Sequence, residues 1–369
     1  MSVGNQVEKP RFFINLLQYQ NEIGNVAVST RYWEDNPTEQ NQHIISLNPT
    51  RSFDMSSSSS PTTHFKVGFK HPISIPTGAT MFVALLGHDF GNETRGGVLT
   101  HQGDGWIVGS DGVEAATEEC IPLVNGGDGG SDWTPEYNGW SLLTFTPSIT
   151  ESISSYNIVV SGSPGAESVL GKFGGFALGI MYEPEFHADL AVTQSRIMDG
   201  VKNKNTRSGS TYSVINYTKP ANWWTGSPFE LTNNDSLVSS SSRIGRRSWN
   251  VGFSQLTDRF YTDGVPNGVF PANEMVNKYE TDVANGEYLA DQDYDSGTNT
   301  FNYNIENDNS LYSTVYHHTL GGTLPFLFSP SQDNSPQNFA ICRFDKPGFA
   351  VTQKSYKKMN IKMKINESW

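Results

Sequence analysis

The chain has 369 residues, a length that fits two or three domains. Charged residues make up 17% of it, fewer than usual for a globular protein, while aromatic residues, at 12%, are too plentiful for a disordered chain. The formal net charge of −13 disfavours a general nucleic-acid binder, which needs a basic face for phosphate. Abundant Ser, Asn, Thr and Gly predict a folded, turn-rich, mainly β protein.

Positive charge gathers at the C-terminal end. From Lys346 to Trp369 there are six Lys against one acid, Glu367, which leaves about −18 for the rest of the chain. Cys120 and Cys342 lie far apart in the sequence, which favours packing positions over a disulfide framework or a zinc site. We expect no membrane span and no export signal, because no apolar run approaches about 18 residues and no basic leader begins the chain.

The first half reads as an extended arm followed by a sandwich. Residues 1–54 are expected to be the arm, with a strand within Phe12–Leu17. Over residues 55–190, short apolar segments alternate with Gly, Pro and Asn, and the continuous run Met81–Leu86 favours a sandwich-core strand. Further strands are expected at Phe65–Phe69, Trp106–Val108, Ser141–Thr146, Tyr156–Val160 and Phe176–Met181. Such spacing predicts a jelly-roll-like β-sandwich domain.

The second half, residues 191–369, predicts a small β-barrel that carries one α-helix. The helix is expected over residues 311–320, with Asn309 or Ser310 as its cap and Gly321 as its left-handed exit. Residues 263–309 are rich in Asp, Asn and Gly and read as a surface insertion. Strict alternation marks two strands, with apolar positions at Trp249, Val251, Phe253, Met359, Ile361, Met363 and Ile365.

Enzyme motifs are missing from the sequence, which has neither Gly-x-Ser-x-Gly nor His-Glu-x-x-His. Asp291, Asp293 and Asp295 have the spacing of a calcium loop. However, Gly297 comes one position late, and Asn302 stands where the bidentate Glu belongs. We interpret this segment as an exposed acidic loop, with calcium binding as the alternative. We expect no catalytic activity, no catalytic residue, no cofactor and no metal.

Histidines are expected to be structural. His317 and His318 are adjacent on the expected helix, so their side chains diverge by about 100° and cannot chelate one ion together. His88 ends the buried run that begins at Met81, where an imidazole can hydrogen-bond and hold a loop in place.

Aromatic residues cluster in two loop regions rich in Asn and Asp. Aromatic rings beside amide and carboxylate groups are what a sugar-binding site requires, and the opposing interpretation is that the rings plug the ends of a sandwich. The residues considered for glycan contact are Trp133, Tyr137, Trp140, Trp223 and Trp224.

Four segments of the second half form a recognisable set: Arg243–Ser254 with its Arg-Arg-Ser-Trp sequence, Leu320–Phe328, Phe339–Phe344 and the closing Lys-rich strand. Together they resemble tail proteins of tailed bacteriophages, the minor tail and distal tail proteins, especially those of marine phages. Residues 199–202 and 208–211 fit the same pattern. The first half is more weakly similar to sandwich domains of such proteins, through Ala84–Phe90.

The resemblance implies a virion structural protein at the tail tip, distal ring or an adaptor position, folded in the host bacterial cytoplasm. It implies a homo-oligomeric ring and other tail proteins as partners, with no nucleic acid and no membrane. The alternative is a carbohydrate-binding adhesin or decoration protein that contacts host surface glycans, and a glycan-degrading enzyme is a third hypothesis. The residues expected at the assembly interface are Lys357, Lys358, Lys362, Lys364, Arg246 and Arg247.

Overall fold

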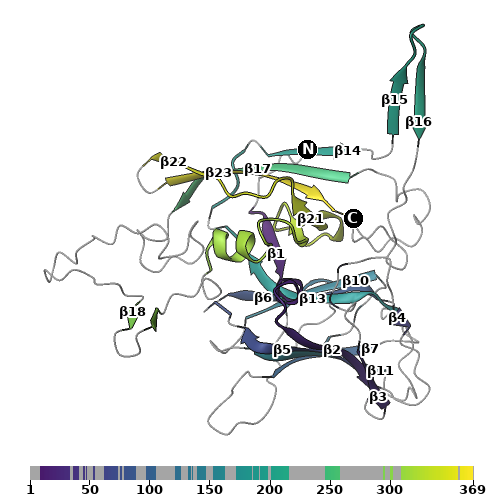
Figure 1. Cartoon of the computed structure of the whole chain (residues 1–369), viewed down its shortest axis with the longest axis vertical. Helices are drawn as coiled ribbons and strands as arrows, with labels where there is room; N and C mark the ends of the chain where they lie inside the picture. Colours follow the sequence, from purple (N-terminus) through teal and green to yellow (C-terminus); the bar gives the residue numbers. More distant parts are fainter. Residues whose placement is uncertain are drawn as a thin grey trace, which may run out of the picture.

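Two large antiparallel sheets dominate the computed structural model of this chain, so the fold is mainly β, as the sequence predicts (Figure 1). The structure describes residues 9–33, 36–40, 45, 47, 53–54, 62–73, 75–76, 79–88, 97–104, 121–125, 132–133, 135, 139–146, 153–162, 172–184, 186–190, 192–197, 201–215, 246–257, 294–295, 300–301, 309–355 and 358–368.

Most of the described elements are strands. They are β1 (Arg11–Asn15), β2 (Val26–Trp33), β3 (Asn36–Gln40), β4 (Phe53–Asp54), β5 (Thr62–Ile73), β6 (Thr80–His88), β7 (Gly97–Asp104), β8 (Ile121–Val124), β9 (Asp132–Trp133), β10 (Gly139–Phe145), β11 (Ile153–Gly162), β12 (Lys172–Phe173), β13 (Gly175–Tyr182), β14 (Thr193–Ile197), β15 (Val201–Asn205), β16 (Thr211–Ile215), β17 (Arg246–Thr257), β18 (Tyr294–Asp295), β19 (Thr300–Phe301), β20 (Phe326–Ser329), β21 (Ala340–Phe344), β22 (Val351–Ser355) and β23 (Lys358–Glu367). The helices are α1 (Leu16–Glu22), the π-helix η6 (Leu311–His317) and the single-turn η7 (Pro336–Asn338).

A β-sandwich fills the lower part of the view in Figure 1. Its six-stranded sheet has the order β3-β2-β5-β11-β7-β9 and packs against β13, β6 and β10 of the larger sheet. Phe65 and Val67 of β5 meet Val83 and Leu85 of β6 in one core, with no exposed side-chain area. The sandwich expected for this half of the chain is therefore confirmed, and so is the core strand expected at Met81–Leu86.

The larger, eleven-stranded sheet continues through both halves of the chain. Its order is β14-β17-β23-β21-β20-β1-β13-β6-β10-β8, with β22 added beside β23. Strand β1 lies in the middle, where Phe12 is opposite Tyr182 on one side and Phe328 on the other. The first strand of the chain thus joins the sandwich to the C-terminal strands.

Close backbone approach holds β1 in this position. Gly179 of β13 is opposite Asn15, and a Cβ atom at Gly179 would lie 1.7 Å from the carbonyl oxygen of Ile14. Only a glycine leaves room for the backbone there. Leu16 and Leu17, expected as the end of a strand, instead begin α1, for which Asn15 is the N-cap and accepts a hydrogen bond from the Gln18 N–H.

The C-terminal half of the long sheet has its own core under η6. Trp249, Val251 and Phe253 of β17 and the alternate residues of β23 face this core together with Leu311 and Val315 of η6. The sequence predicts a separate small barrel here. In the structure, the described strands instead continue the eleven-stranded sheet of the first half, because β1 pairs with both β13 and β20. The domain boundaries at residues 54 and 190 stay predictions.

The expected helix is present, with a wider turn than predicted. Ser310 is its N-cap and accepts a hydrogen bond from the Ser313 N–H at 3.1 Å, as expected. The Gly321 N–H donates to the carbonyl of Tyr316, five residues earlier. The left-handed exit expected at Gly321 is observed, and it already begins at Leu320, whose φ is 51°. The helix is of π type over Leu311–His317, and after it the chain turns away through Leu320 and two glycines.

Candidate functional site

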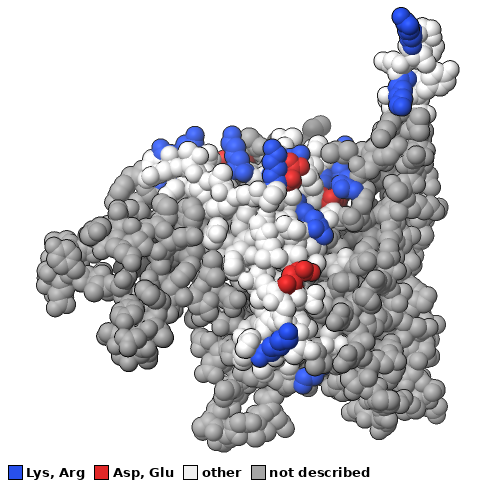
Figure 2. All heavy atoms as spheres, viewed as in Figure 1, with Lys and Arg blue, Asp and Glu red and all other residues white. Residues whose placement is uncertain are grey.

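The outer surface of the C-terminal half-sheet carries a row of polar and basic side chains. In the register of β17 and β23, Asn250 is opposite Lys364 and Gly252 is opposite Lys362. Their neighbours in sequence face the core, so these four residues point away from it. We call these four residues the lysine face. Figure 2 shows Lys and Arg side chains gathered along this upper border of the molecule.

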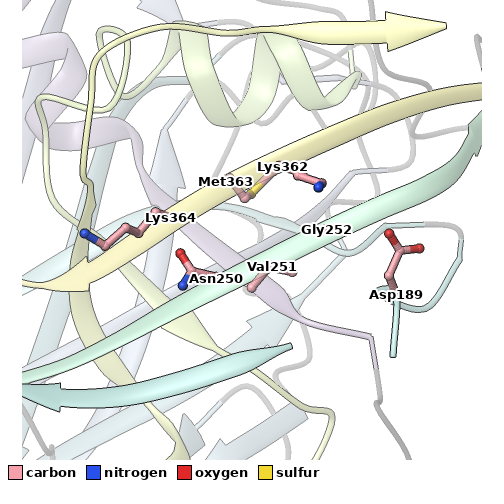
Figure 3. A pocket seen from close by; sticks show the side chains of 7 residues that line it. All are labelled: Asp189, Asn250, Val251, Gly252, Lys362, Met363 and Lys364. Carbon is pink, nitrogen blue, oxygen red and sulfur yellow. The ribbon is translucent and has the colours of Figure 1, made fainter. Parts of the chain in front are cut away.

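A groove of about 360 Å³ crosses the lysine face (Figure 3). Gly252, which has no side chain and is opposite Lys362, lies between Asn250 and Ser254 on its own strand and is one of the residues that line the groove. The seven lining residues are Asp189, Asn250, Val251, Gly252, Lys362, Met363 and Lys364. Two amines, one amide and one carboxylate thus surround a small, partly apolar floor.

Asp189 is held at one end of the groove by hydrogen bonds. Its N–H donates to the carbonyl of Gly252 at 2.8 Å. Its Oδ1 accepts from the N–H and the hydroxyl of Ser254 at 3.1 and 2.6 Å. A Cβ atom at Gly252 would lie 3.1 Å from Asp189 Oδ2, so this carboxylate oxygen lies directly beside the gap. These three hydrogen bonds fix the position of the carboxylate at this end of the groove.

At the other end, Lys364 belongs to a polar network. Its Nζ donates to Asp345 Oδ1 at 3.0 Å, and Asn366 Nδ2 donates to the same oxygen at 2.8 Å. The hydrogen bond from Lys364, followed by that from Asn366, lowers the pKa of the Asp345 carboxyl. Lys364 is thereby oriented along the sheet, whereas Lys362 points toward the gap beside Gly252 (Figure 3).

These groups suit binding of an acidic or amide-bearing partner. Amines donate hydrogen bonds to carboxylate or phosphate, and the Asn250 amide both donates and accepts. The sequence pattern predicted Lys362 and Lys364 but did not identify Asn250 or Asp189. The alternation of Trp249, Val251 and Phe253 is the signal that places Asn250 outside, whereas Asp189 has no local pattern and is positioned by long-range contacts.

One expected interface residue, Arg247, is in fact inside the protein. Its side chain and that of Glu367 are buried, and its Nε lies 2.5 Å from Glu367 Oε1. The Arg247 N–H donates to Glu367 Oε2, and its guanidinium also donates to the carbonyl of Phe339 at 2.8 Å. Arg247 therefore cannot contact a second subunit, because its guanidinium is consumed by this internal ion pair.

The other expected interface residues have mixed positions. Lys358 is half-buried, with its Nζ 4.8 Å from the centre of the Phe186 ring, and Arg246 is also half-buried. Lys357 lies outside the described residues. Strand β23 pairs with β17 on one side and with β21 and β22 on the other, so it lies inside the sheet and not at its edge. A second subunit that contacts β23 must therefore do so through the side chains on the exposed face of this strand.

Of the residues expected to contact glycan, Trp140 is the one whose side chain the structure describes. It is 1% exposed, and its ring packs edge-on against Phe339 at 5.3 Å between centroids. Trp140 therefore has the plugging role, because its ring completes a core. Trp133 lies in β9 with its side chain outside the described part, and Tyr137, Trp223 and Trp224 lie wholly outside it.

The buried histidines and cysteine serve packing. His88 Nε2 is 2.9 Å from the Ser141 hydroxyl, which donates to the carbonyl of Asn125, and burial lowers the pKa of His88 to about 3. His318 is buried, also with its pKa lowered to about 3, first by burial and then by His317. Cys342 lies in the core, where burial raises the pKa of its thiol. The structural role expected for His88 is confirmed.

Other kinds of site have little support in the described ranges. Within them no cluster of three or more His, Cys, Asp or Glu is arranged to hold a metal ion. No helix among these residues is long and apolar enough to cross a bilayer. Asp295, from the suggested calcium loop, belongs to the small hairpin of β18 and β19, and Asp291 and Asp293 lie outside the described residues.

Comparison with known proteins gives no assignment. No protein-family model matches the chain, and no curated protein matches it.

Proposed function

We propose that this chain is a structural subunit of a tailed-phage virion, located at the tail tip, distal ring or an adaptor position. In this proposal the subunit assembles through the lysine face and displays its sandwich. The observation that carries the proposal is the exposure of Lys362 and Lys364 around a groove on a chain of net charge −13. Oppositely charged surfaces steer docking and fix its register.

The design of β23 supports this proposal. Met359, Ile361, Met363 and Ile365 are buried in the subunit's own core, so the strand's apolar face needs no partner. Its outer face is exposed at Lys362 and Lys364, beside the groove, where both amines can donate to an acidic or amide group of a partner. A heterologous contact of this kind allows identical subunits to close into a ring.

The alternative of a glycan-binding adhesin draws less support from the described side chains. Trp140, the one expected glycan contact whose side chain lies in the described part of the chain, is buried. A stacking site for sugar needs an exposed aromatic face. We therefore place assembly ahead of glycan contact.

The proposal is tested by locating the protein and by reversing charge on the lysine face. Antibodies against the chain should label one end of the tail in electron micrographs of particles from cells that express it. Lys362→Glu with Lys364→Glu should leave the fold intact by circular dichroism but block incorporation into particles.

The matched control is Lys66→Glu with Lys70→Glu on β5, which changes the net charge by the same amount on the sandwich. This control should incorporate normally. Absence of label from particles would refute the virion assignment, and normal incorporation of the folded lysine-face variant would refute the assigned interface.

A further inference from the structure

The hairpin formed by β15 and β16 projects from the body of the molecule at the end near β14 (Figure 1). The side chains described from Asn203 to Ser213 are exposed, apart from a half-buried Thr206, and none of them belongs to a hydrophobic core cluster. A two-stranded ribbon without a core is marginally stable by itself. The hairpin therefore needs either strong local order or a partner that covers it.

Local order is present along the hairpin. Five residue pairs are in register, from Val201 opposite Ile215 to Asn205 opposite Thr211. On one side, the Thr211 hydroxyl donates to the Asn205 side chain at 3.0 Å, and an equivalent bond joins Ser213 to Asn203 at 2.8 Å. These hydrogen bonds organise the ribbon before any partner arrives, which lowers the entropy lost on binding.

The turn of the hairpin is also closed by hydrogen bonds. The Thr206 N–H donates to the carbonyl of Ser210 at 2.8 Å, and the Ser210 N–H donates to the Thr206 hydroxyl at 3.0 Å. Gly209 has a φ of +85°, which favours glycine. Arg207, between these residues, is thereby presented at the tip, where its side chain is exposed.

Charge and aromatic area are concentrated on this arm. Residues 201–215 contain three cations and no acid, a formal charge of +3. Because the whole chain has a net charge of −13, the other 354 residues sum to −16. Lys204 is directly opposite Tyr212, whose side chain is 63% exposed. Exposed Tyr and Arg residues are enriched at the energetic centres of protein interfaces.

We propose that this hairpin is a docking arm that binds an acidic surface of a second copy of this chain. Charge complementarity carries the choice of partner, because the residues of another copy outside its hairpin have a formal net charge of −16, opposite in sign to the arm. The arm and the surface it contacts lie on different parts of the chain, so the contact is heterologous and repeats from copy to copy. The proposal depends on the proposed function for its setting in a particle, but it is tested on the purified chain.

The test combines crosslinking with sedimentation of the purified full chain. With benzoylphenylalanine in place of Tyr212, ultraviolet light should yield a covalent dimer of this chain, with the crosslink located by mass spectrometry. Lys204→Glu with Arg207→Glu should weaken self-association by about tenfold or more in sedimentation velocity at low salt. High salt should weaken the association of the unaltered chain too.

Lys66→Glu with Lys70→Glu serves as the control of equal charge change and should associate normally. Equal weakening by both double variants, or no dimer crosslink from position 212, would overturn the proposal. So would a chain that stays monomeric and binds a DNA duplex or an anionic polysaccharide through the hairpin. A dimer that crosslinks through position 212 in a protein absent from virions would refute the proposed function alone.

Discussion

The buried ion pair between Arg247 and Glu367 gives the sharpest test of the internal structure. Replacing Arg247 by Met keeps most of the side-chain volume but removes the cation that faces Glu367 Oε1 at 2.5 Å. Glu367 is 1% exposed, so its carboxylate would remain in the core without the guanidinium, although the backbone N–H of residue 247 would still donate to it. Removing one partner of such a pair costs about 3–5 kcal/mol in the free energy of unfolding.

The double variant Arg247→Met with Glu367→Leu should behave differently from either single change. Neither charge then needs to be buried, and replacement of a whole buried pair by apolar residues is often neutral or stabilising. We therefore expect each single variant to lose about 3–5 kcal/mol and the double variant to lie within about 1 kcal/mol of the original chain.

The pH dependence supplies a second readout. Burial raises the pKa of Glu367 above its ordinary value of 4.5, while Arg247 opposes that rise. A carboxyl whose folded pKa exceeds its unfolded value stabilises the fold fully below about 4.5, and this stability is lost as the pH rises through the folded pKa. Without Arg247 the pKa rises further, so the deficit of Arg247→Met should shrink as the pH falls toward 4.5.

Urea unfolding followed by tryptophan fluorescence suits this comparison, because the Arg247 guanidinium lies 5.2 Å from the Trp249 ring. Two results would contradict a coupled, buried ion pair. One is a loss in the double variant equal to the sum of the single losses, and the other is an unchanged unfolding midpoint in Arg247→Met. An unchanged midpoint would mean that Arg247 does not stabilise the folded subunit and is free for another role, such as a contact between subunits.

Two further predictions concern buried rings. Trp140→Ala should lower the free energy of unfolding by about 3–5 kcal/mol in urea titrations, because the ring fills a core against Phe339. Unchanged stability together with a loss of adsorption to glycan would contradict this prediction. Burial lowers the pKa of His88 from its ordinary 6.5 to about 3. The stability that the neutral His88 contributes is therefore complete above pH 6.5. As the pH falls from 6.5 toward 3, the free energy of unfolding should decrease by at most about 1.4 kcal/mol per pH unit. In His88→Gln the amide can still donate to Ser141 but does not titrate. The urea midpoint of this variant should therefore fall less between pH 7 and pH 5 than that of the original chain, and equal falls would exclude His88 as the cause of the pH dependence.

Local sequence determined the features that depend on side-chain periodicity. The alternation from Met359 to Ile365 determined which face of β23 is buried and left Lys362 and Lys364 outside. The buried run at Met81–Leu86 indicated a core strand for the same reason, and Ser310 marked the start of a helix because its side chain caps a nearby N–H. Helical spacing could not distinguish an α-helix from a π-helix, because both place these apolar residues on one face.

The tertiary structure decided everything that depends on pairing between distant segments. Phe12 and Phe328 become neighbours because β1 inserts into the centre of the long sheet, and no local pattern encodes that choice of partner. Arg247 and Glu367, 120 residues apart, are each ordinary surface residues by composition until β17, β21 and β23 bring them together in the core. The groove beside Gly252 likewise forms where two strands and a connecting segment meet, because shape and burial arise only after the chain has folded.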